Sequence, residues 1–404
     1  MRVPCDCRTY TSKQVNVLLP RVIYKCCPIA ANEEQGLLVV MSHSRSEMFL
    51  FDFENVFVSI LRPQIFRYEF VIHLCSLRFQ MEFSHVPALL KTLGQRALDS
   101  EDLGDEVTLD KLEIEFAGLR FKNPFMLSSA PPAMDARHIL RAARLGWGGA
   151  VIKTVTEEPT VDPRIRLGAL RQGRNLIGMN NIELLSRESV KTWTDDWIPA
   201  IKKEAPEDFI LVASIMSSPE PEGWAALAET MTSAGADAIE LNVSCPHGSP
   251  EKHMGAFIGQ NPNLVQDITR AARKGTGLPL LVKLTPNVTD MVPIAKAAVE
   301  GGADGLSAIN TVESLIGVDI ETATPHPFAY GAASSAPMST YGGFCGPSIR
   351  PIGLRFVSQL ARAFPATPIS GIGGIEDWYS AIEYLMVGAS TLQVCTAAMW
   401  HGYG

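Results

Sequence analysis

Long hydrophobic runs, an excess of positive charge and paired cysteine motifs are all missing from this 404-residue sequence. No stretch of roughly 18 uncharged apolar residues occurs, and this absence excludes a membrane-spanning helix. The net charge of -8 argues against nucleic acid as the main partner. None of the eight cysteines belongs to a C-x-x-C pair. The sequence therefore spells out neither a zinc ribbon nor a cysteine-ligated cluster, and we predict no metal site.

Glycine is scarce in the first quarter of the chain. Of the 32 glycines, only Gly36, Gly94 and Gly104 precede residue 108. The glycine-rich remainder has the composition that repeated strand-to-helix turns require. We therefore predict two domains, an unassigned N-terminal extension over residues 1–108 and a second domain over residues 109–404. Two apolar runs in the extension, at 48–60 and 66–79, are candidate strands.

The location of the protein is suggested by its first residues and its cysteines. Residues 1–32 carry five basic residues and one acid, a bias that is also found in transit peptides. They have no apolar core of a secretory signal, so an unstructured extension is the favoured interpretation. The three cysteines beyond residue 108 are expected to stay reduced, as in the cytoplasm.

From residue 109 onward the hydrophobic pattern is regular. The segments LEIEF and LRF around Gly118 predict a small hairpin. Eight apolar strand segments then alternate with seven segments whose apolar residues recur at helical spacing. The predicted strands are 125–129, 150–154, 209–215, 238–243, 280–284, 305–309, 368–371 and 391–395. The predicted helices are 135–145, 184–204, 220–234, 263–274, 291–301, 349–364 and 377–386. This order predicts the α/β class and a (β/α)8 TIM barrel.

The end of the chain leaves little room for an eighth helix. Only nine residues follow Cys395, fewer than a helix needs to cover the seam between the last strand and the first. We therefore expect a C-terminally truncated barrel that lacks its last helix. Apolar faces left open at that seam would make the domain marginally stable, or would favour a homo-oligomer.

Polar residues follow the predicted strands at the points where the strands end. In a TIM barrel these ends meet at one rim, where the catalytic residues of such enzymes lie. Cys245 emerges there from the segment ELNVSCPHG. A lone cysteine is more often a small buried hydrophobic residue, but a thiol among hydrogen-bonding groups can give or take a proton. The other polar residues at the rim are Ser128, Ser129, Lys153, Thr154, Asn242, Ser244, Lys283, Asn310, Thr311 and Thr396, with glycines at 371, 373 and 374.

Six motifs then establish a family resemblance. They are LNVSCPHG, VKLTPNVTD, SAINT, STYGGFCGPSIRPI, GIGGIED and LQVCTA, spread over about residues 112–399. Together they resemble the FMN-binding barrel of dihydropyrimidine dehydrogenases, especially the iron-sulfur flavoprotein subunit of the bacterial NAD-dependent enzyme. Dihydroorotate dehydrogenases are broader relatives. The resemblance implies an oxidoreductase that acts on a CH–CH group and interconverts uracil or thymine and their 5,6-dihydro forms, in pyrimidine catabolism. It also implies an FMN cofactor and a partner subunit that binds NAD(P)H and FAD.

The resemblance assigns roles to individual residues. Cys245 matches the catalytic acid and base, which protonates C5 of the pyrimidine in the reductive direction. The positions that match hydrogen-bonding partners of the pyrimidine are Asn181, Glu183, Asn242, Asn310 and Thr311. The positions that match FMN contacts are Ser128, Ser129, Lys153, Ser244 and Lys283, with Gly346, Gly373, Gly374, Cys395 and Thr396 around the phosphate.

The sequence also departs from the family pattern. Its relatives continue into a segment that ligates iron-sulfur clusters, which is absent here, and residues 1–108 match nothing in the family. Cys345 stands where related barrels have a small serine-like residue. Two alternatives therefore stay open: a dihydroorotate dehydrogenase, and an inactive truncated remnant. His247 favours dihydropyrimidines over orotate, because orotate-specific relatives read SCPN where this chain reads SCPH.

Overall fold

The computed structural model describes residues 37–41, 48–52, 58–60, 112–157, 166–246, 254–327, 329–330, 337–339 and 341–404. The chain divides into two compact units, Met1–Arg78 and Phe79–Gly404. In the first unit, β1 (Leu37–Met41), β2 (Met48–Asp52) and β3 (Val58–Ile60) form an antiparallel sheet in that order. The candidate strands at 48–60 are thus confirmed, whereas the run at 66–79 lies outside the described residues. A domain boundary near residue 108 stays a prediction.

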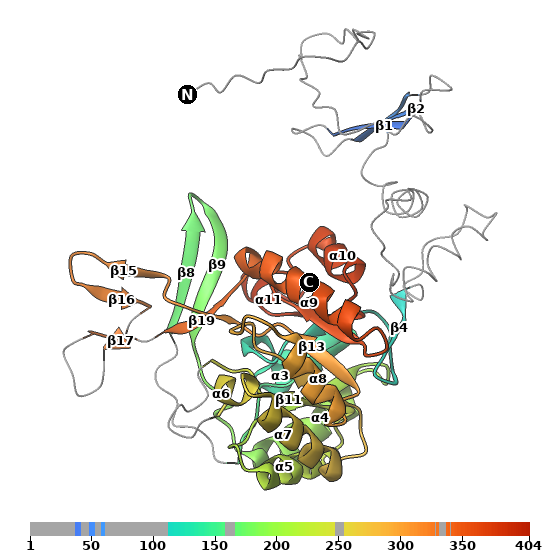
Figure 1. Ribbon diagram of the computed structural model, residues 1–404, viewed down its shortest axis with the longest axis vertical. Helices are drawn as coiled ribbons and strands as arrows, with labels where there is room; N and C mark the ends of the chain where they lie inside the picture. The colour runs from blue at the N-terminus through green and yellow to red at the C-terminus, as the bar shows by residue number, and fades with distance from the viewer. Residues whose placement is uncertain are drawn as a thin grey trace. The chain divides into compact units, whose positions relative to one another are not determined.

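The second unit is built on a closed barrel of eight parallel strands, as the sequence predicted (Figure 1). All eight predicted strands are present. In barrel order they are β6 (Phe125–Leu127), β7 (Gly149–Val151), β10 (Ile210–Ile215), β11 (Ala238–Asn242), β12 (Leu280–Lys283), β13 (Gly305–Ala308), β20 (Ile369–Ile372) and β21 (Thr391–Val394). Every residue of β10 and β11 is buried. Strands covered on both faces are mostly apolar, which is why runs of hydrophobic residues predicted them. The predicted hairpin is also present, as β4 (Ile114–Phe116) and β5 (Leu119–Phe121).

Helices cover the outside of the barrel at the predicted places. They are α3 (Ala136–Arg144), α4 (Ile198–Glu204), α5 (Pro221–Ser233), α7 (Pro262–Gly275), α8 (Val292–Glu300), α9 (Arg350–Ala363) and α10 (Trp378–Met386), with the one-turn helix α6 (Ala256–Gly259) before α7. The helix predicted from residue 184 begins only at 190 and continues through the π-helical segment η3 (Thr192–Trp197) into α4. Among the described residues, no helix is long and apolar enough to cross a membrane.

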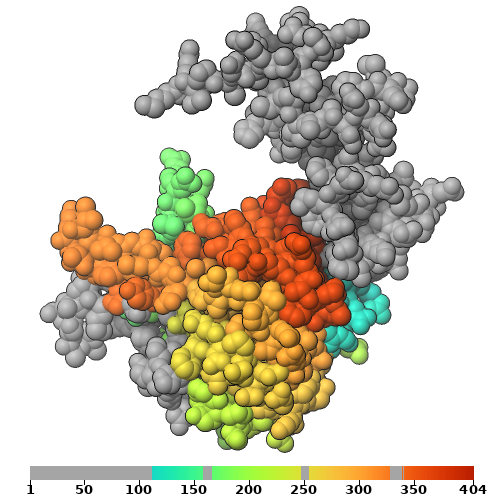
Figure 2. All heavy atoms as spheres, viewed as in Figure 1, coloured from blue at the N-terminus to red at the C-terminus, as the bar shows by residue number. Residues whose placement is uncertain are grey.

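A second sheet stands above the barrel and was not predicted. Strands β8 (Arg166–Gln172) and β9 (Asn175–Ile182) form a hairpin that joins β19 (Gly342–Cys345) and β14 (Val312–Ser314) in the order β14-β19-β9-β8. Figure 2 shows this hairpin projecting from the body of the barrel, with a further projection at β15 (Gly317–Asp319) and β16 (Thr324–His326). Short strands β17 (Ala329–Tyr330) and β18 (Pro337–Met338) pair beyond it. This sheet carries the end of β9 toward the barrel rim.

The last residues of the chain pack onto the first βα unit. Where the sequence predicted no room for an eighth helix, Thr396–His401 form the short helix α11. Beyond it, Tyr403 Oη donates a hydrogen bond to the Pro132 carbonyl over 3.0 Å, and Trp147 Nε1 donates to the Tyr403 carbonyl over 2.8 Å. The Arg141 guanidinium lies 5.3 Å from the centre of the Tyr403 ring. Residues 396–404 thus tie the last strand to the region that follows the first.

We predict that Tyr403→Ala lowers the free energy of unfolding by about 2 kcal/mol, because it removes a part-buried hydrogen bond and a cation–π contact. Chemical denaturation followed by far-UV circular dichroism measures the difference. Tyr379→Ala is the matched control, since Tyr379 is 53% exposed on α10 and its loss should cost less than about 0.5 kcal/mol. If the two substitutions lower the free energy of unfolding equally, the contacts of Tyr403 do not stabilise the barrel.

Candidate active site

A cavity of about 1010 Å3, including its open mouth, lies at the carboxyl ends of the barrel strands. Its walls come from the ends of β6, β7, β11, β12, β13 and β21, from the end of β9, and from the glycine turns after β19 and β20. The predicted rim residues are therefore brought together at one place.

The cavity collects fifteen of the sixteen residues that the sequence analysis assigned to the site. They are Ser128, Ser129, Lys153, Asn181, Glu183, Asn242, Cys245, Lys283, Asn310, Thr311, Gly346, Gly373, Gly374, Cys395 and Thr396. The remaining one, Ser244, is fully buried behind the wall. Its hydroxyl donates to Asn242 Oδ1 over 3.0 Å and lies 2.8 Å from Asn310 Nδ2. Ser244 thus supports the two asparagines from behind.

Asn242 is fixed by hydrogen bonds on both sides of its amide group. Its Nδ2 donates to Thr154 Oγ1 over 2.9 Å, and its Oδ1 accepts from the Ser244 backbone and hydroxyl. Thr154 Oγ1 in turn lies 3.0 Å from Ser129 Oγ and 2.9 Å from Ser214 Oγ. A connected set of hydrogen bonds holds rotamers in place. The floor of the cavity is therefore preorganised across β6, β7, β10 and β11.

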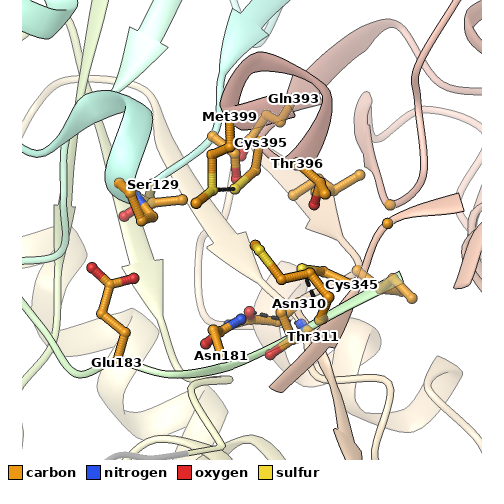
Figure 3. Close-up of a pocket in the computed structure, with 18 of the residues that line it drawn as sticks. Ser129, Asn181, Glu183, Asn310, Thr311, Cys345, Gln393, Cys395, Thr396 and Met399 are labelled. Atoms are coloured by element: carbon orange, nitrogen blue, oxygen red, sulfur yellow. Dashed lines mark hydrogen bonds between the residues drawn. The ribbon is translucent and has the colours of Figure 1, made fainter. Parts of the chain in front are cut away.

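One wall presents amides and a hydroxyl. Asn181 Nδ2 donates to the Gly343 carbonyl over 3.0 Å, and the Thr311 side chain packs against the same glycine. Asn310 Oδ1 accepts from the Thr311 backbone N–H over 2.8 Å. Figure 3 shows the three side chains at one end of the cavity, beside Cys345. Groups of this kind can both donate to and accept from a flat polar ring.

Two lysines place positive charge in the cavity. Lys153, at the end of β7, is 8% exposed and its Nζ lies 3.2 Å from Glu183 Oε2. Lys283, at the end of β12, is 3% exposed, and the nearest carboxylate oxygen is Glu240 Oε1 at 4.0 Å. Both ammonium groups are largely shielded from water. They can therefore act strongly on a ligand that binds in the cavity.

Three glycines with left-handed backbones form the opposite end. Gly346, Gly373 and Gly374 have φ angles of 95°, 125° and 70°. A Cβ at Gly374 would lie only 2.8 Å from the Gly346 carbonyl oxygen, and Tyr384 Oη supports the turn by donating to the Gly373 carbonyl over 2.7 Å. No described residue accepts a hydrogen bond from the N–H groups of Gly373 and Gly374. Such unpaired donors suit a phosphate, and the Thr396 hydroxyl lines the same cavity.

Three thiols line the cavity, those of Cys245, Cys345 and Cys395. Cys345 Sγ donates to the Met179 carbonyl over 3.3 Å, and Cys395 Sγ lies 3.8 Å from Met399 Sδ. Burial raises the pKa of both the Cys345 and the Cys395 thiol, which keeps them protonated. Cys245 is 9% exposed and comes three residues after β11 ends. It therefore stands near Asn242, on the same side of the cavity as the end of β11.

Sequence reasoning missed two polar residues of the cavity. Gln393 lies on β21, two residues before Cys395, so the period of a strand could have placed it on the inner face. Glu376 follows the glycine turn, and burial is the main cause that raises the pKa of its carboxyl. Among the described residues, no group of three or more His, Cys, Asp or Glu side chains is placed to hold a metal ion.

Comparison with known proteins now places the chain. A family model described as dihydroorotate dehydrogenase matches residues 111–404. The chain belongs to the dihydroorotate dehydrogenase family. The match spans the whole barrel and every candidate residue of the cavity.

Within the dihydroorotate dehydrogenase family, the similar proteins include two kinds of enzyme. The chain is 40% identical to the NAD-dependent dihydropyrimidine dehydrogenase subunit PreA of Escherichia coli K12 over 299 residues, 72% of this chain and 69% of that protein. It is 36% identical to the chloroplastic dihydropyrimidine dehydrogenase (NADP(+)) of Arabidopsis thaliana over 306 residues, 72% and 70% of the two chains. It is also 36% identical to the catalytic subunit of dihydroorotate dehydrogenase B (NAD(+)) from Pyrococcus horikoshii over 299 residues, 72% and 88%.

The fold of the family is also found in solved structures. The ligand-free dihydroorotate dehydrogenase of Eimeria tenella superposes with a TM-score of 0.56 at 21% identity, over 75% of this chain and 86% of that one. At this identity the likeness supports the barrel fold alone.

Proposed function

We propose that this chain is a flavin-dependent dihydropyrimidine dehydrogenase, which interconverts uracil or thymine and their 5,6-dihydro forms. The observation that carries the proposal is the joint placement of Cys245, the amide wall and two buried lysines around one cavity. The relatives named dihydropyrimidine dehydrogenase, at 36% and 40% identity, point the same way. A dihydroorotate dehydrogenase is the second candidate, because relatives of that name match at 36% and 38%.

FMN fits the residues that are present. The three glycines leave a cradle that side chains would fill, since a Cβ at Gly346 would lie 3.3 Å from Trp400 and 3.1 Å from the Gly178 Cα. The phosphate would be held there by backbone N–H groups and by Thr396. Ser128, Ser129, Lys153 and Lys283 would hold the ring system, on the wall formed by β6, β7 and β12. When bound, FMN supplies a carrier that gives or accepts hydride.

The chain's own residues bind and orient the pyrimidine. Asn181, Asn310 and Thr311 would pair with the alternating N–H and carbonyl groups of the base. Asn242 keeps this wall in place through its fixed amide. Glu183 can accept a hydrogen bond from a base N–H, and in the structure it also holds the Lys153 ammonium.

Cys245 moves the proton in this proposal. In the reductive direction its thiol donates a proton to C5 of the pyrimidine, and in the oxidative direction the thiolate takes the same proton back. A thiol ionises far more readily than a serine hydroxyl, which suits a group that both gives and takes a proton. His247, which the sequence analysis linked to the choice between uracil and orotate, lies outside the described residues.

The partner and the location are further parts of the proposal. Electrons would come from a second subunit that binds NAD(P)H and FAD, an idea supported by the relative that is named a subunit. Cys345 and Cys395 are thiols, which agrees with the cytoplasm as a reducing compartment. Iron-sulfur clusters would belong to the rest of such an assembly.

The cofactor is the first test of the proposal. We expect the purified full chain, incubated with FMN and desalted, to retain about one flavin per chain with its visible absorbance and with quenched fluorescence. Free riboflavin, which has no phosphate, is the matched control and should be lost on desalting. A colourless protein after incubation with FMN would support the inactive remnant and contradict the enzyme.

A further inference from the structure

Glu240 is a fully buried acid beneath the floor of the cavity, and the function proposed above gives it no role. It lies on β11 two residues before Asn242, so both side chains are on the inner face of the strand. Its Oε2 accepts hydrogen bonds from Ser307 Oγ on β13 over 2.8 Å and from Gln393 Nε2 on β21 over 2.9 Å. The carboxyl group is therefore held from two other strands of the barrel.

The second oxygen of Glu240 is directed differently. Among the described residues, Glu240 Oε1 has no hydrogen-bond partner, and the Lys283 ammonium lies 4.0 Å away. Lys283 is the strand neighbour of both Asn242 and Ser307, which places it between the floor and the cavity. No hydrogen bond from its ammonium to a described residue is present. Its donors are therefore available to a ligand in the cavity.

A buried ammonium is costly unless a negative charge compensates it. We infer that Glu240 is a positioning residue, whose fixed carboxylate keeps Lys283 charged and close to the ligand. The carboxylate is well suited to this task, because two hydrogen bonds to Oε2 keep it in place when a ligand binds. The inference deepens the proposed function, on which it rests for the identity of the ligand as FMN.

The second lysine of the cavity provides a contrast. Glu183, the partner of Lys153, itself lines the cavity, so a bound substrate can compete for it. Glu240 does not line the cavity, and no ligand can reach it without displacing Lys283 or Gln393. The carboxylate beside Lys283 is therefore shut off from the cavity, whereas the carboxylate beside Lys153 faces it.

Other groups act on the same space and must be kept constant in a test. The field of Lys283 and of Lys153 acts on the Cys395 thiol, as does that of Glu183. Besides Lys283, the titratable and charged groups that line the cavity are Lys153 after β7, Glu183 after β9, Cys245 after β11, Cys345 on β19, Glu376 after β20 and Cys395 after β21. None of these is altered in the variants below.

The test follows the protonation of Lys283 in the full chain without FMN. Lysines are labelled with 13C at Cε, and the Lys283 resonance is identified by its loss in Lys283→Met. The chemical shift of this resonance is followed against pH in the wild type and in Glu240→Gln. In Glu240→Gln it should titrate about one pH unit or more below the wild type, a tenfold change in proton concentration, because the counter-charge is gone.

Controls separate this role from a purely structural one. Glu300→Gln removes one exposed carboxylate on α8 and should leave the Lys283 titration unchanged. Glu240→Asp, which keeps the charge but withdraws it by one methylene, should displace the titration in the same direction by less, and it replaces Glu240→Gln if that variant does not fold. If Lys283 titrates in Glu240→Gln as it does in the wild type, the inference is overturned. The same outcome in Glu240→Asp overturns it when Glu240→Gln does not fold. If a variant loses stability while the titration of Lys283 stays unchanged, the role of Glu240 is only to join the barrel strands by hydrogen bonds.

The readout with FMN bound distinguishes this inference from the proposed function. The midpoint potential of bound FMN is measured as a function of pH. In Glu240→Gln we expect the slope of this plot to change at one additional pH, where Lys283 loses its proton. In the double variant Glu240→Gln/Lys283→Met this additional change of slope should be absent. A change that persists without Lys283 would mean that Glu240 acts on the cofactor directly, against the inference. If the wild type binds no FMN, the proposed function fails, but the titration of Lys283 without FMN still decides the role of Glu240.

Discussion

Cys245→Ala is expected to slow pyrimidine turnover by about 10²- to 10⁴-fold while FMN stays bound, which is the usual contribution of a general acid or base. The expectation follows from the site. Cys245 lines the cavity after the end of β11. Burial raises the pKa of Cys345 and Cys395 and so disfavours their thiolates. Neither of these two thiols is therefore expected to replace Cys245.

The measurement is kcat/KM for uracil, together with the flavin content of each preparation. Cys345→Ser is the matched control, since a serine hydroxyl can keep the hydrogen bond to the Met179 carbonyl. It should retain activity to within a few-fold. Near-normal kcat/KM in Cys245→Ala would remove the thiol from the mechanism, because a group that acts only in the transition state must lower kcat and kcat/KM together.

Gly373→Asp is expected to weaken FMN binding by about 100-fold or more. The backbone at Gly373 has a φ of 125°, which side chains rarely adopt, and an added Cβ would lie 3.2 Å from both Ile349 Cδ1 and Tyr384 Oη. The new carboxylate would also repel the phosphate where N–H groups should bind it. Both effects act on cofactor retention rather than on proton transfer.

Quenching of FMN fluorescence on titration with protein gives the dissociation constant. Gly118→Asp introduces the same side chain at another left-handed glycine, in the β4–β5 turn, where nothing lies within 4 Å of the added Cβ. It should bind FMN as the wild type does. If Gly373→Asp binds FMN equally well, the phosphate site must lie elsewhere in the barrel.

The barrel could be predicted because its strands are buried on both faces. Segments such as Ile210–Ile215, in which Ser214 is the single polar residue, are bounded by turns, so runs of hydrophobic residues located them. The β8–β9 hairpin could not be found in this way. Arg166–Gln172 alternates between part-buried and exposed residues and includes two arginines, which is the pattern of a strand at the solvent edge.

In the site, residues at the ends of strands could be predicted from the sequence, whereas residues deeper in the barrel could not. Residues at the ends of strands, such as Lys153 and Asn310, were predicted because parallel strands bring their ends to one rim. Ser244 was predicted to face the cofactor, but Val243 N–H bonds the Leu241 carbonyl in a three-residue turn, and the alternation of the strand ends there. Glu240 and Gln393 were missed because their partners come from strands far apart in the sequence.

The most direct test of the central claim is a single turnover with two substrates. The FMN-loaded full chain is reduced without oxygen and mixed with uracil or with orotate at equal concentration, and the flavin absorbance is followed while the product is identified by mass spectrometry. We predict that uracil reoxidises the flavin at least about tenfold faster and yields 5,6-dihydrouracil, a ratio typical of discrimination by a polar site. Faster reoxidation by orotate would contradict the account and make the protein a dihydroorotate dehydrogenase.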